Sequence, residues 1–264
     1  MNYVDSHCHF NSPELRSITE EVLTRASAAG VTRMAVVGTT LEDSEEAVEI
    51  CRNFPGFGLF PTVGIHPHEA KDYGRTVPER LIELARLPEV RAWGEIGLDY
   101  YYDLSQRDEQ IDMLALQLEA AKEISKPVVF HVRDGYGDFW PLMTPERVPD
   151  KAELHCFSGS MDDVKKGLDL GWKFGFTGVV TFKKADDVRD IVRFLPLESI
   201  LCETDSPYMS PVPFRGKVNE PSRVPLIYQK VAEVKNLPLE QVVEQLLHNN
   251  VEFFGLEDME EKDV

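Results

Sequence analysis

The chain has 264 residues, of which 42% are apolar, and its formal net charge is −18. This length suits one large α/β domain, because α/β barrels of roughly 250 residues form single domains. The acidic balance disfavours a protein that holds duplex nucleic acid through a broad basic surface, so any contact with phosphates must be local. Ordinary glycine and proline contents exclude collagen-like and low-complexity chains.

The amino-terminal sequence carries no export signal, since no basic start is followed by an apolar run. No stretch approaches the roughly 18 consecutive apolar residues that a membrane span needs. We therefore expect a cytoplasmic protein without membrane association, and nothing indicates an obligate protein partner. The four cysteines are predicted to be reduced thiols rather than disulfides; they are Cys8, Cys51, Cys156 and Cys202.

Short apolar runs alternate with amphipathic stretches along the chain, which predicts repeated strand–helix units and a parallel sheet. The expected strands cover residues 2–9, 31–38, 57–64, 90–97, 127–132, 153–157, 172–178 and 199–205. Eight strands is the number in a closed barrel, so the predicted fold is α/β, a TIM-type (β/α)8 barrel in a single domain over residues 1–256. Residues 257–264 form an acidic tail that we expect to stay solvated.

Helix start signals lie between the expected strands. The predicted N-caps, each followed by a proline or an acidic residue that favours a helix start, are Ser12, Thr76, Ser105 and Ser160. After Ser105, apolar residues recur at spacings of three and four, so one face of that helix is expected to pack against the sheet.

Histidines and carboxylates gather at the ends of the expected strands. His7 and His9 are two residues apart, so both imidazoles point to the same face of a strand. Active-site residues of parallel barrels lie at the carboxyl ends of the strands, so side chains in these places should converge. The other members of the set, each closing an apolar run, are Glu95, His131, His155 and Asp205.

A cation at the common centre explains two carboxylates in apolar surroundings, because burying a carboxylate without a partner is costly. Buried ion pairs are the competing interpretation, but few basic residues occur in these strands and only Arg133 adjoins the cluster. Six ligands exceed the four of one tetrahedral zinc site, which favours two divalent ions.

Glu95 is the natural bridge between two ions, because a carboxylate offers two oxygens whereas an imidazole gives one nitrogen. His7 and His9 would then hold one ion, and His131 and His155 the other. Asp205 is expected to bind the first ion and to accept a proton from the attacking water. Paired ions that activate water predict hydrolysis as the reaction class, with Asp205 and Glu95 as the catalytic residues.

Six ordered motifs span nearly the whole chain. They are Asp5-Ser6-His7-Cys8-His9, Gly64-Ile65-His66-Pro67, Gly94-Glu95-Ile96-Gly97-Leu98-Asp99-Tyr100, His131-Val132-Arg133, His155-Cys156-Phe157-Ser158-Gly159 and Glu203-Thr204-Asp205-Ser206-Pro207. Together they resemble the TatD-like metal-dependent deoxyribonucleases, which belong to the amidohydrolase-like barrels. Residues 215–221 are similar to the Arg-Gly-x-x-Asn-x-Pro loop of that family, with Val218 where relatives commonly have a basic residue.

The resemblance implies an eight-stranded barrel that uses divalent metals to hydrolyse phosphodiester bonds of DNA, shortening single strands from their 3′ ends. It implies that the metal ligands are His7, His9, Glu95, His131, His155 and Asp205. The imidazoles favour zinc, manganese, iron or cobalt, and the resemblance allows magnesium. The alternative is a barrel metallo-hydrolase acting on a small amide, lactone or phosphoester. A metal-holding protein without catalysis is a third reading, which the proton acceptor Asp205 disfavours.

Several residues around the metals are expected to contact substrate. The resemblance places His66 near the phosphate, with turn capping as the alternative. Arg133 is expected to bind a phosphate bidentately or to pair with Asp99 or Asp134. The loop after the last strand offers aromatic faces for stacking or for packing, in Tyr208 and Phe214, and its predicted substrate contacts are Arg215, Lys217 and Asn219.

Overall fold

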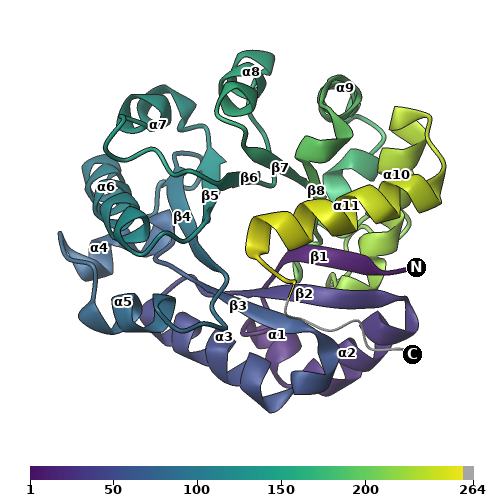
Figure 1. Ribbon diagram of the computed structural model, residues 1–264, viewed down its shortest axis with the longest axis horizontal. Coiled ribbons are helices and arrows are strands. Elements are labelled where there is room, and N and C mark those ends of the chain that lie inside the picture. The colour runs from purple at the N-terminus through teal and green to yellow at the C-terminus, as the bar shows by residue number, and fades with distance from the viewer. Residues whose placement is uncertain (258–264) are drawn as a thin grey trace.

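The computed structural model describes residues 1–257, in which eight parallel strands surround a common axis in sequence order. Each strand pairs with the next one along the chain (Figure 1). This confirms the predicted α/β fold, a TIM-type (β/α)8 barrel in a single domain. The strands are β1 (Tyr3–Cys8), β2 (Val31–Val37), β3 (Leu59–Val63), β4 (Ala92–Asp99), β5 (Val128–Arg133), β6 (Ala152–His155), β7 (Lys173–Phe176) and β8 (Ile200–Cys202).

Most helices surround the strands, and α11 crosses one end of the barrel (Figure 1). The helices are α1 (Pro13–Arg16), α2 (Thr19–Ala28), α3 (Leu41–Asn53), α4 (Ala70–Tyr73), α5 (Glu79–Ala85), α6 (Arg107–Glu123), α7 (Tyr136–Leu142), α8 (Met161–Asp169), α9 (Asp186–Phe194), α10 (Val224–Lys235) and α11 (Leu239–Phe254). Single 3-10 turns are η1 (Pro55–Phe57), η2 (Pro67–Glu69), η3 (Gly178–Thr181), η4 (Leu197–Ser199) and η5 (Pro221–Arg223).

The barrel closes between its first and last strands, at their carboxyl ends. Cys8 and Ser206 form an isolated parallel bridge. The His9 amide donates to the Ser206 carbonyl at 2.8 Å, and the Asp205 amide donates to the His7 carbonyl at 2.9 Å. Residues from opposite ends of the chain therefore become neighbours at the closing seam.

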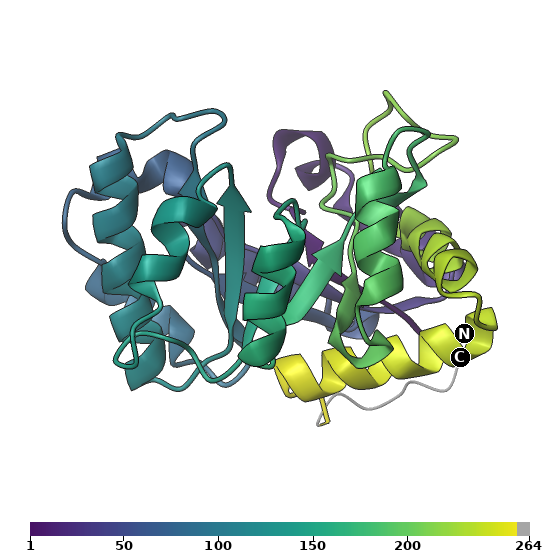
Figure 2. The same ribbon diagram turned by 90° about the horizontal axis from the view of Figure 1, so that it is seen from above.

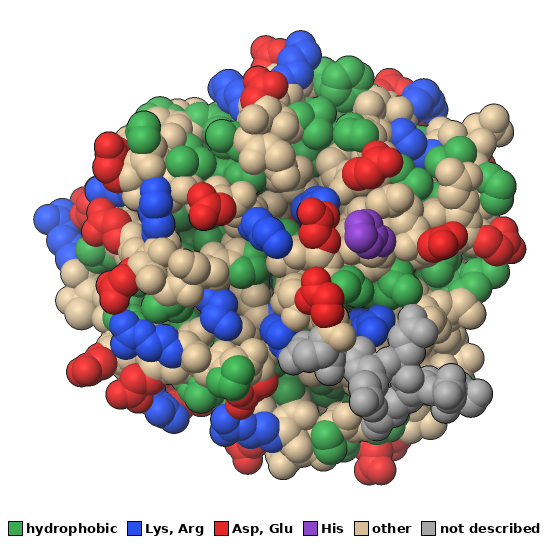
Figure 3. All heavy atoms as spheres, viewed as in Figure 1, with side chains coloured by type: hydrophobic (Ala, Val, Ile, Leu, Met, Phe, Trp, Pro, Cys, Tyr) green, Lys and Arg blue, Asp and Glu red, His purple; other side chains and the backbone are tan. Residues whose placement is uncertain are grey.

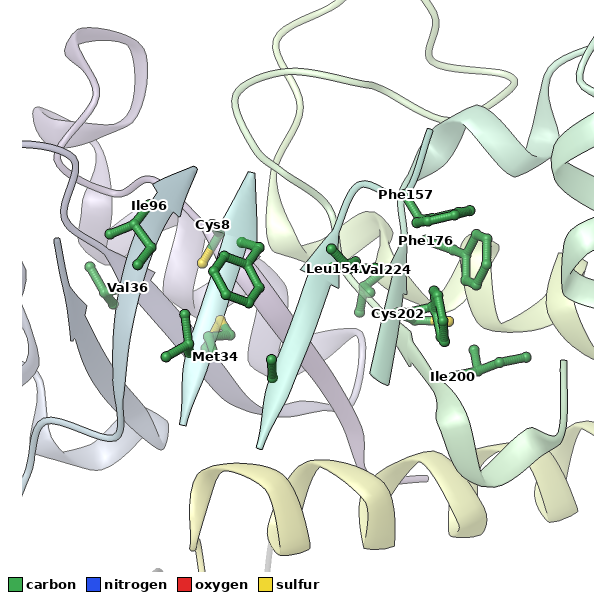
Figure 4. Packing of buried hydrophobic residues seen from close by; sticks show 14 of the residues in the cluster. Cys8, Met34, Val36, Ile96, Leu154, Phe157, Phe176, Ile200, Cys202 and Val224 are labelled. Atoms are coloured by element: carbon green, nitrogen blue, oxygen red, sulfur yellow. The ribbon is translucent and has the colours of Figure 1, made fainter. Parts of the chain in front are cut away.

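Alternation along the strands separates an outer apolar layer from the barrel interior. Val36, Ile96 and Leu154, from three different strands, belong to the outer layer that the helices cover (Figure 4). A second cluster inside the barrel joins the end of α11 to the strand residues Ala35, Phe60, Ala92, Val129 and Leu201. Phe253 and Phe254 of that helix close the amino-terminal end of the barrel, and the strands point away from it (Figure 2).

Two of the four predicted N-caps are confirmed. Ser12 occupies the N-cap position of α1, although its hydroxyl forms no capping hydrogen bond within residues 1–257, and Ser160 caps α8 in a capping box with Asp163. Thr76 is wrong as a cap, because Pro78 occupies the N-cap position of α5.

The predicted cap Ser105 is wrong by one residue. Gln106 caps α6 in a capping box with Glu109. The Ser105 hydroxyl instead donates to the His68 carbonyl at 2.7 Å, so it ties the loop after β4 to the loop after β3.

Buried glutamines of α6 hold the same two loops. The Gln117 side-chain oxygen accepts from the Ile65 amide at 2.8 Å, and the Gln110 side-chain oxygen accepts from the Asp99 amide at 2.8 Å. Both glutamines are fully buried. The helix thus fixes the ends of β3 and β4 where chemistry is expected.

Three further predictions concern the whole chain. The four cysteines are free thiols, as predicted. Within residues 1–257, no helix has both the length and the apolar character that crossing a bilayer requires. The acidic tail lies outside the described residues from position 258 onward, so its boundary at residue 256 stays a prediction.

Candidate metal centre

The predicted ligands meet around one carboxylate, that of Glu95 on β4. Its Oε2 atom lies 3.3 Å from His7 Nε2 and 3.8 Å from His9 Nε2. Its Oε1 atom lies 2.9 Å from His131 Nδ1 and 3.3 Å from His155 Nε2. The two oxygens of Glu95 therefore face two different pairs of imidazoles.

Asp205 completes the cluster on the side of His9. Its Oδ1 atom lies 3.4 Å from His9 Nε2. The residue follows β8 with a φ of 52°, so the backbone turns sharply there. Burial by itself would raise the pKa of Asp205, but the hydrogen bond with His9 and the neighbouring imidazoles lower it. The carboxylate is therefore ionised at neutral pH, and it can bind a cation or accept a proton.

Glu95 is also held in its charged form. Burial opposes ionisation, yet the surrounding imidazoles, with His155 nearby and His131 hydrogen-bonded to the carboxylate, hold the pKa of Glu95 well below its ordinary value. Burial likewise disfavours charge on His155, but Glu203 and Glu95 raise the pKa of this imidazole well above its ordinary value. Buried anions thus require positive charge among the imidazoles, which is the role that a divalent cation takes over.

The donor atoms fit divalent cations. The Nε2 atoms of His7 and His9 are 3.2 Å apart and face the same carboxylate oxygen. Imidazole and carboxylate groups are the usual ligands of zinc and similar ions. Ligand atoms within 4.8 Å of one another occur in the sets His7, His9 and Glu95; His7, His155 and Glu203; and His66, Glu95 and His131.

Two carboxylates outside the predicted ligand set contact the ring nitrogens of His131 and His155 that do not face Glu95. Asp99 Oδ2 lies 2.9 Å from His131 Nε2, and Glu203 Oε1 lies 2.9 Å from His155 Nδ1. Such carboxylates fix the orientation of a ligating ring and raise its basicity. A usable signal existed, because Glu203 stands two residues before Asp205, a spacing that points both into the barrel.

A second acid lies next to Glu203 in the barrel interior. Ser6 Oγ is 3.4 Å from a carboxyl oxygen of Glu153 and 3.4 Å from one of Glu203. Burial and the nearby Glu203 raise the pKa of Glu153 well above its ordinary value, so Glu153 is neutral. Gly175 makes room for the pair, because a Cβ there would lie 2.6 Å from Glu153 and 2.7 Å from Glu203.

The cluster forms the floor of a cavity of about 920 Å³. The cavity opens at the end toward which the strands point in Figure 2. Its wall includes Tyr102 from the loop after β4, Arg133 from the end of β5, and Tyr208 from the loop after β8. A concave site with a polar floor and partly apolar walls is typical of substrate binding.

His66 caps a turn and also lines the cavity. Its Nδ1 atom accepts from the His68 amide at 3.1 Å, and its Nε2 atom lies 3.6 Å from Glu95 Oε1. Burial lowers the pKa of His66 well below its ordinary value, so the ring is neutral. Because Nδ1 accepts, the proton sits on Nε2. His66 therefore offers the cavity an N–H donor rather than a lone pair for a metal.

Arg133 does not form the predicted structural ion pair. Its guanidinium lies 3.8 Å from the centre of the Tyr101 ring, and among residues 1–257 it forms no ion pair with Asp99 or Asp134. Asp99 is already engaged by His131. The guanidinium stacks on an aromatic ring at the cavity wall instead.

Only part of the loop after β8 lines the cavity. Tyr208 lines it, whereas Arg215, Lys217 and Phe214 are not among the described residues that do. The Arg215 guanidinium lies 4.1 Å from the centre of the Phe182 ring, and Lys217 lies 5.8 Å from that of Phe214. Of the two aromatic faces predicted for stacking, Tyr208 is at the mouth and Phe214 is covered by basic side chains.

Asn219, a predicted substrate contact, is not among the described residues that line the cavity. It is fully buried, its side-chain amide donates to the Thr204 carbonyl at 2.9 Å, and its backbone amide donates to the Pro207 carbonyl at 2.9 Å. Asn219 therefore positions the chain on both sides of Asp205.

The cysteines near the cluster are not nucleophiles. Cys8 faces outward and donates to the Ala35 carbonyl at 2.9 Å. Cys156 lines the cavity, because a φ of 42° ends the alternation of β6. Burial raises the pKa of the Cys156 thiol to about 12, and a neutral thiol reacts poorly.

A (β/α)8 barrel with imidazoles and carboxylates converging at the carboxyl ends of its strands defines a barrel hydrolase of the metal-dependent class. Residues 4–255 match the family described as TatD related DNase. The chain belongs to this family, and it is a metal-dependent hydrolase.

Relatives of similar length support this assignment. The uncharacterized metal-dependent hydrolase YabD of Bacillus subtilis (strain 168) is 33% identical over 253 residues, which cover 96% of this chain and 98% of that protein. The 3′-5′ ssDNA/RNA exonuclease TatD of Klebsiella pneumoniae (strain 342) is 36% identical over 245 residues, covering 90% and 92%. The crystal structure of YjjV, a TatD homolog from Escherichia coli K12, superposes with a TM-score of 0.86 at 30% identity, covering 96% and 98%.

Proposed function

We propose that this hydrolase cleaves phosphodiester bonds of single-stranded DNA and removes nucleotides from the 3′ end. The observation that carries the proposal is the placement of the Glu95 carboxylate, whose two oxygens face separate pairs of imidazoles. That arrangement suits two cations bridged by one carboxylate, as in many enzymes that displace an alkoxide from phosphorus. The Klebsiella pneumoniae relative, a 3′-5′ ssDNA/RNA exonuclease, supports a single-stranded nucleic acid as substrate and this polarity.

The proposed cofactor is a pair of divalent ions, with zinc, manganese and magnesium as candidates. When bound, the ions supply Lewis-acid activation of water and of the phosphate. The residues assigned to the first ion are His7, His9 and Asp205; those assigned to the second are His131 and His155; and the bridge is Glu95.

The protein's own groups handle the proton and the phosphate. Asp205 is ionised beside His9, so it can accept the proton of the attacking water. His66 offers an N–H group, and Arg133 offers a guanidinium, to phosphate oxygens. Arg215 and Lys217 lie farther out, where they would add positive charge along a longer strand.

The burial of the candidate metal ligands favours the end of a single nucleic-acid strand over a duplex as substrate. Glu95 is 3% exposed and His155 is 4% exposed, so a phosphate must enter the cavity to reach them. The end of a single strand can enter in this way, whereas paired strands would have to separate first. The net charge of −18 also gives no broad basic surface for a duplex.

The second candidate function is hydrolysis of a small amide, lactone or phosphoester. The apolar part of the cavity wall favours it, because enclosed apolar walls suit small ligands. This part is lined by Phe157, Phe176, Val179 and Ile191.

The discriminating experiment incubates the purified protein, loaded with each candidate metal, with a 5′-labelled single strand and with the same strand in a duplex. Parallel reactions contain a small phosphate ester, an amide and a lactone. We expect a ladder of products that shortens stepwise from the 3′ end of the single strand. Turnover of the amide or lactone without cleavage of DNA would instead establish the second candidate.

A further inference from the structure

The loop after β4 exposes large apolar side chains beside the cavity. Tyr101 and Tyr102 are 58% and 56% exposed. Their rings pack edge to face with centroids 4.9 Å apart, and Tyr102 also lines the cavity. Adjacent exposed aromatic rings at the rim of a cleft are typical of ligand-binding surfaces.

Asp99 holds this loop in a fixed position relative to the floor. Its Oδ1 atom accepts from the Tyr101 amide at 3.0 Å and from the Tyr102 amide at 2.8 Å. Its Oδ2 atom lies 2.9 Å from His131 Nε2. One carboxylate thus links the two tyrosines to a candidate metal ligand, so the rings are placed before substrate arrives.

Arg133 joins the two tyrosines from the neighbouring strand. Its guanidinium lies 3.8 Å from the centre of the Tyr101 ring and 5.1 Å from that of Tyr102. In the part of the chain that the structure describes, no carboxylate pairs with it. The planar group is stacked and oriented, and its donors remain available to an anion.

A third exposed ring faces the mouth from the opposite side. Tyr208 is 56% exposed and follows β8, which lies across the barrel from β4. In Figure 2 the loops after β4 and after β8 rise on either side of the mouth, in blue and in light green. The candidate metal floor therefore lies between aromatic groups on two sides.

We propose that Tyr101, Tyr102 and Arg133 form a nucleotide platform, on which an unpaired base stacks against Tyr102 while Arg133 pairs with a phosphate next to the scissile one. The inference rests on the proposed function and names its substrate class as a strand with unpaired terminal bases. Stacking accepts every base, so the platform gives affinity without sequence preference. It also suits a chain of net charge −18, which attracts a polyanion poorly.

The test uses the full-length, metal-loaded protein and two single strands of equal length, one unmodified and one lacking the bases of its last two 3′ residues. The initial rate of nucleotide release is measured. We expect Tyr102→Ala to raise KM for the unmodified strand about tenfold, with kcat nearly unchanged. The same substitution should leave KM for the base-free strand unchanged, and Tyr102→Phe should behave as the wild type.

Leu104→Ala is the matched control. Leu104 lies in the same loop, is 53% exposed and carries no ring. Its truncation should change KM for neither strand. Because all these side chains are exposed, each variant should melt within about 2 °C of the wild type.

Two kinds of failure can be told apart. If wild-type protein shortens the unmodified strand but Tyr102→Ala leaves KM unchanged, or raises it equally for both strands, the platform is refuted and the proposed function stands. If the wild type hydrolyses a small ester but neither strand, the proposed function is refuted and the platform with it.

Discussion

The two ends of the barrel are built from the same eight strands but carry opposite chemistry. At the carboxyl ends, buried ionisable groups surround Glu95 beneath an open cavity. At the amino ends, Phe253 and Phe254 pack against Ala35 and Val129 inside the barrel, and no comparable group of imidazoles occurs there in residues 1–257.

Basic side chains at the amino ends hold backbone rather than ligands. They border a smaller cavity of about 340 Å³. Lys126 Nζ donates to the carbonyls of Leu87 and Val90, and Lys151 Nζ donates to the carbonyl of Glu252 at 2.9 Å. Figure 3 looks onto this end and shows acidic and basic side chains interspersed over it.

The contrast shows how a parallel barrel separates stability from catalysis. All strands point the same way, so every side chain that ends a strand meets the others at one end only. The other end is free to be filled by α11. Perturbations at the mouth should therefore change activity, and perturbations at the plugged end should change stability.

Removing divalent ions should have the largest effect. Chelation followed by dialysis is expected to eliminate turnover, because the floor then lacks its Lewis acids. Returning zinc, manganese or magnesium should restore activity, and elemental analysis should find up to two ions per chain. Full turnover by protein in which analysis finds no metal would end the metal assignment.

Asp205→Asn should lower kcat by roughly a hundred- to ten-thousandfold, because the amide keeps the shape of the side chain but cannot accept a proton. Steady-state kinetics would give the loss, and circular dichroism would check that the fold is retained. Wild-type kcat in this variant would refute the assigned role.

Glu203→Gln should weaken metal binding by about 10- to 100-fold, because the charged group behind His155 is lost. Glu153→Gln is the matched control, since Glu153 is buried in the same layer but is already neutral. Metal titrations of both variants provide the comparison. Equal losses in the two would mean that packing, and not charge, explains the effect.

The effect of pH on the stability gained from metal binding should be smaller, and its sign is defined. Despite burial, Glu203 and Glu95 raise the folded-state pKa of His155 above its unfolded value, so its charge stabilises the metal-free fold at low pH. That stability is lost as pH rises through the raised pKa. Metal ions replace the charge and need deprotonated rings, so the rise in Tm on adding metal should be larger at about pH 8 than at about pH 6. A rise that shrinks with pH would contradict the linkage.

Lys126→Met should leave activity unchanged and lower the free energy of unfolding by about 1–2 kcal/mol, because two carbonyls lose a charged donor. Denaturant unfolding and initial rates on the same preparation test both halves of this expectation. A fall in activity with unchanged stability would show that the two ends are coupled.

Sequence patterns predicted the strands and the meeting of the candidate ligands around Glu95, because both depend on short-range rules. Alternation places His7 and His9 on one face, and a run of apolar residues marks each strand wherever it lies. Helix starts were less secure. Ser105 was the expected cap of α6, but its hydroxyl is occupied by the His68 carbonyl, and Gln106 caps the helix instead.

By itself, the sequence determined the order of eight strands, the side of each strand that carries imidazoles or carboxylates, and thus the convergence on Glu95. Only the tertiary structure decided what the longer polar side chains contact: Arg133 stacks on Tyr101, and Asn219 is buried beside Asp205. Periodicity acts along the chain and can be read from it. A flexible side chain, by contrast, selects its partner from whatever groups the fold brings within reach, and spacing in the sequence does not record that choice.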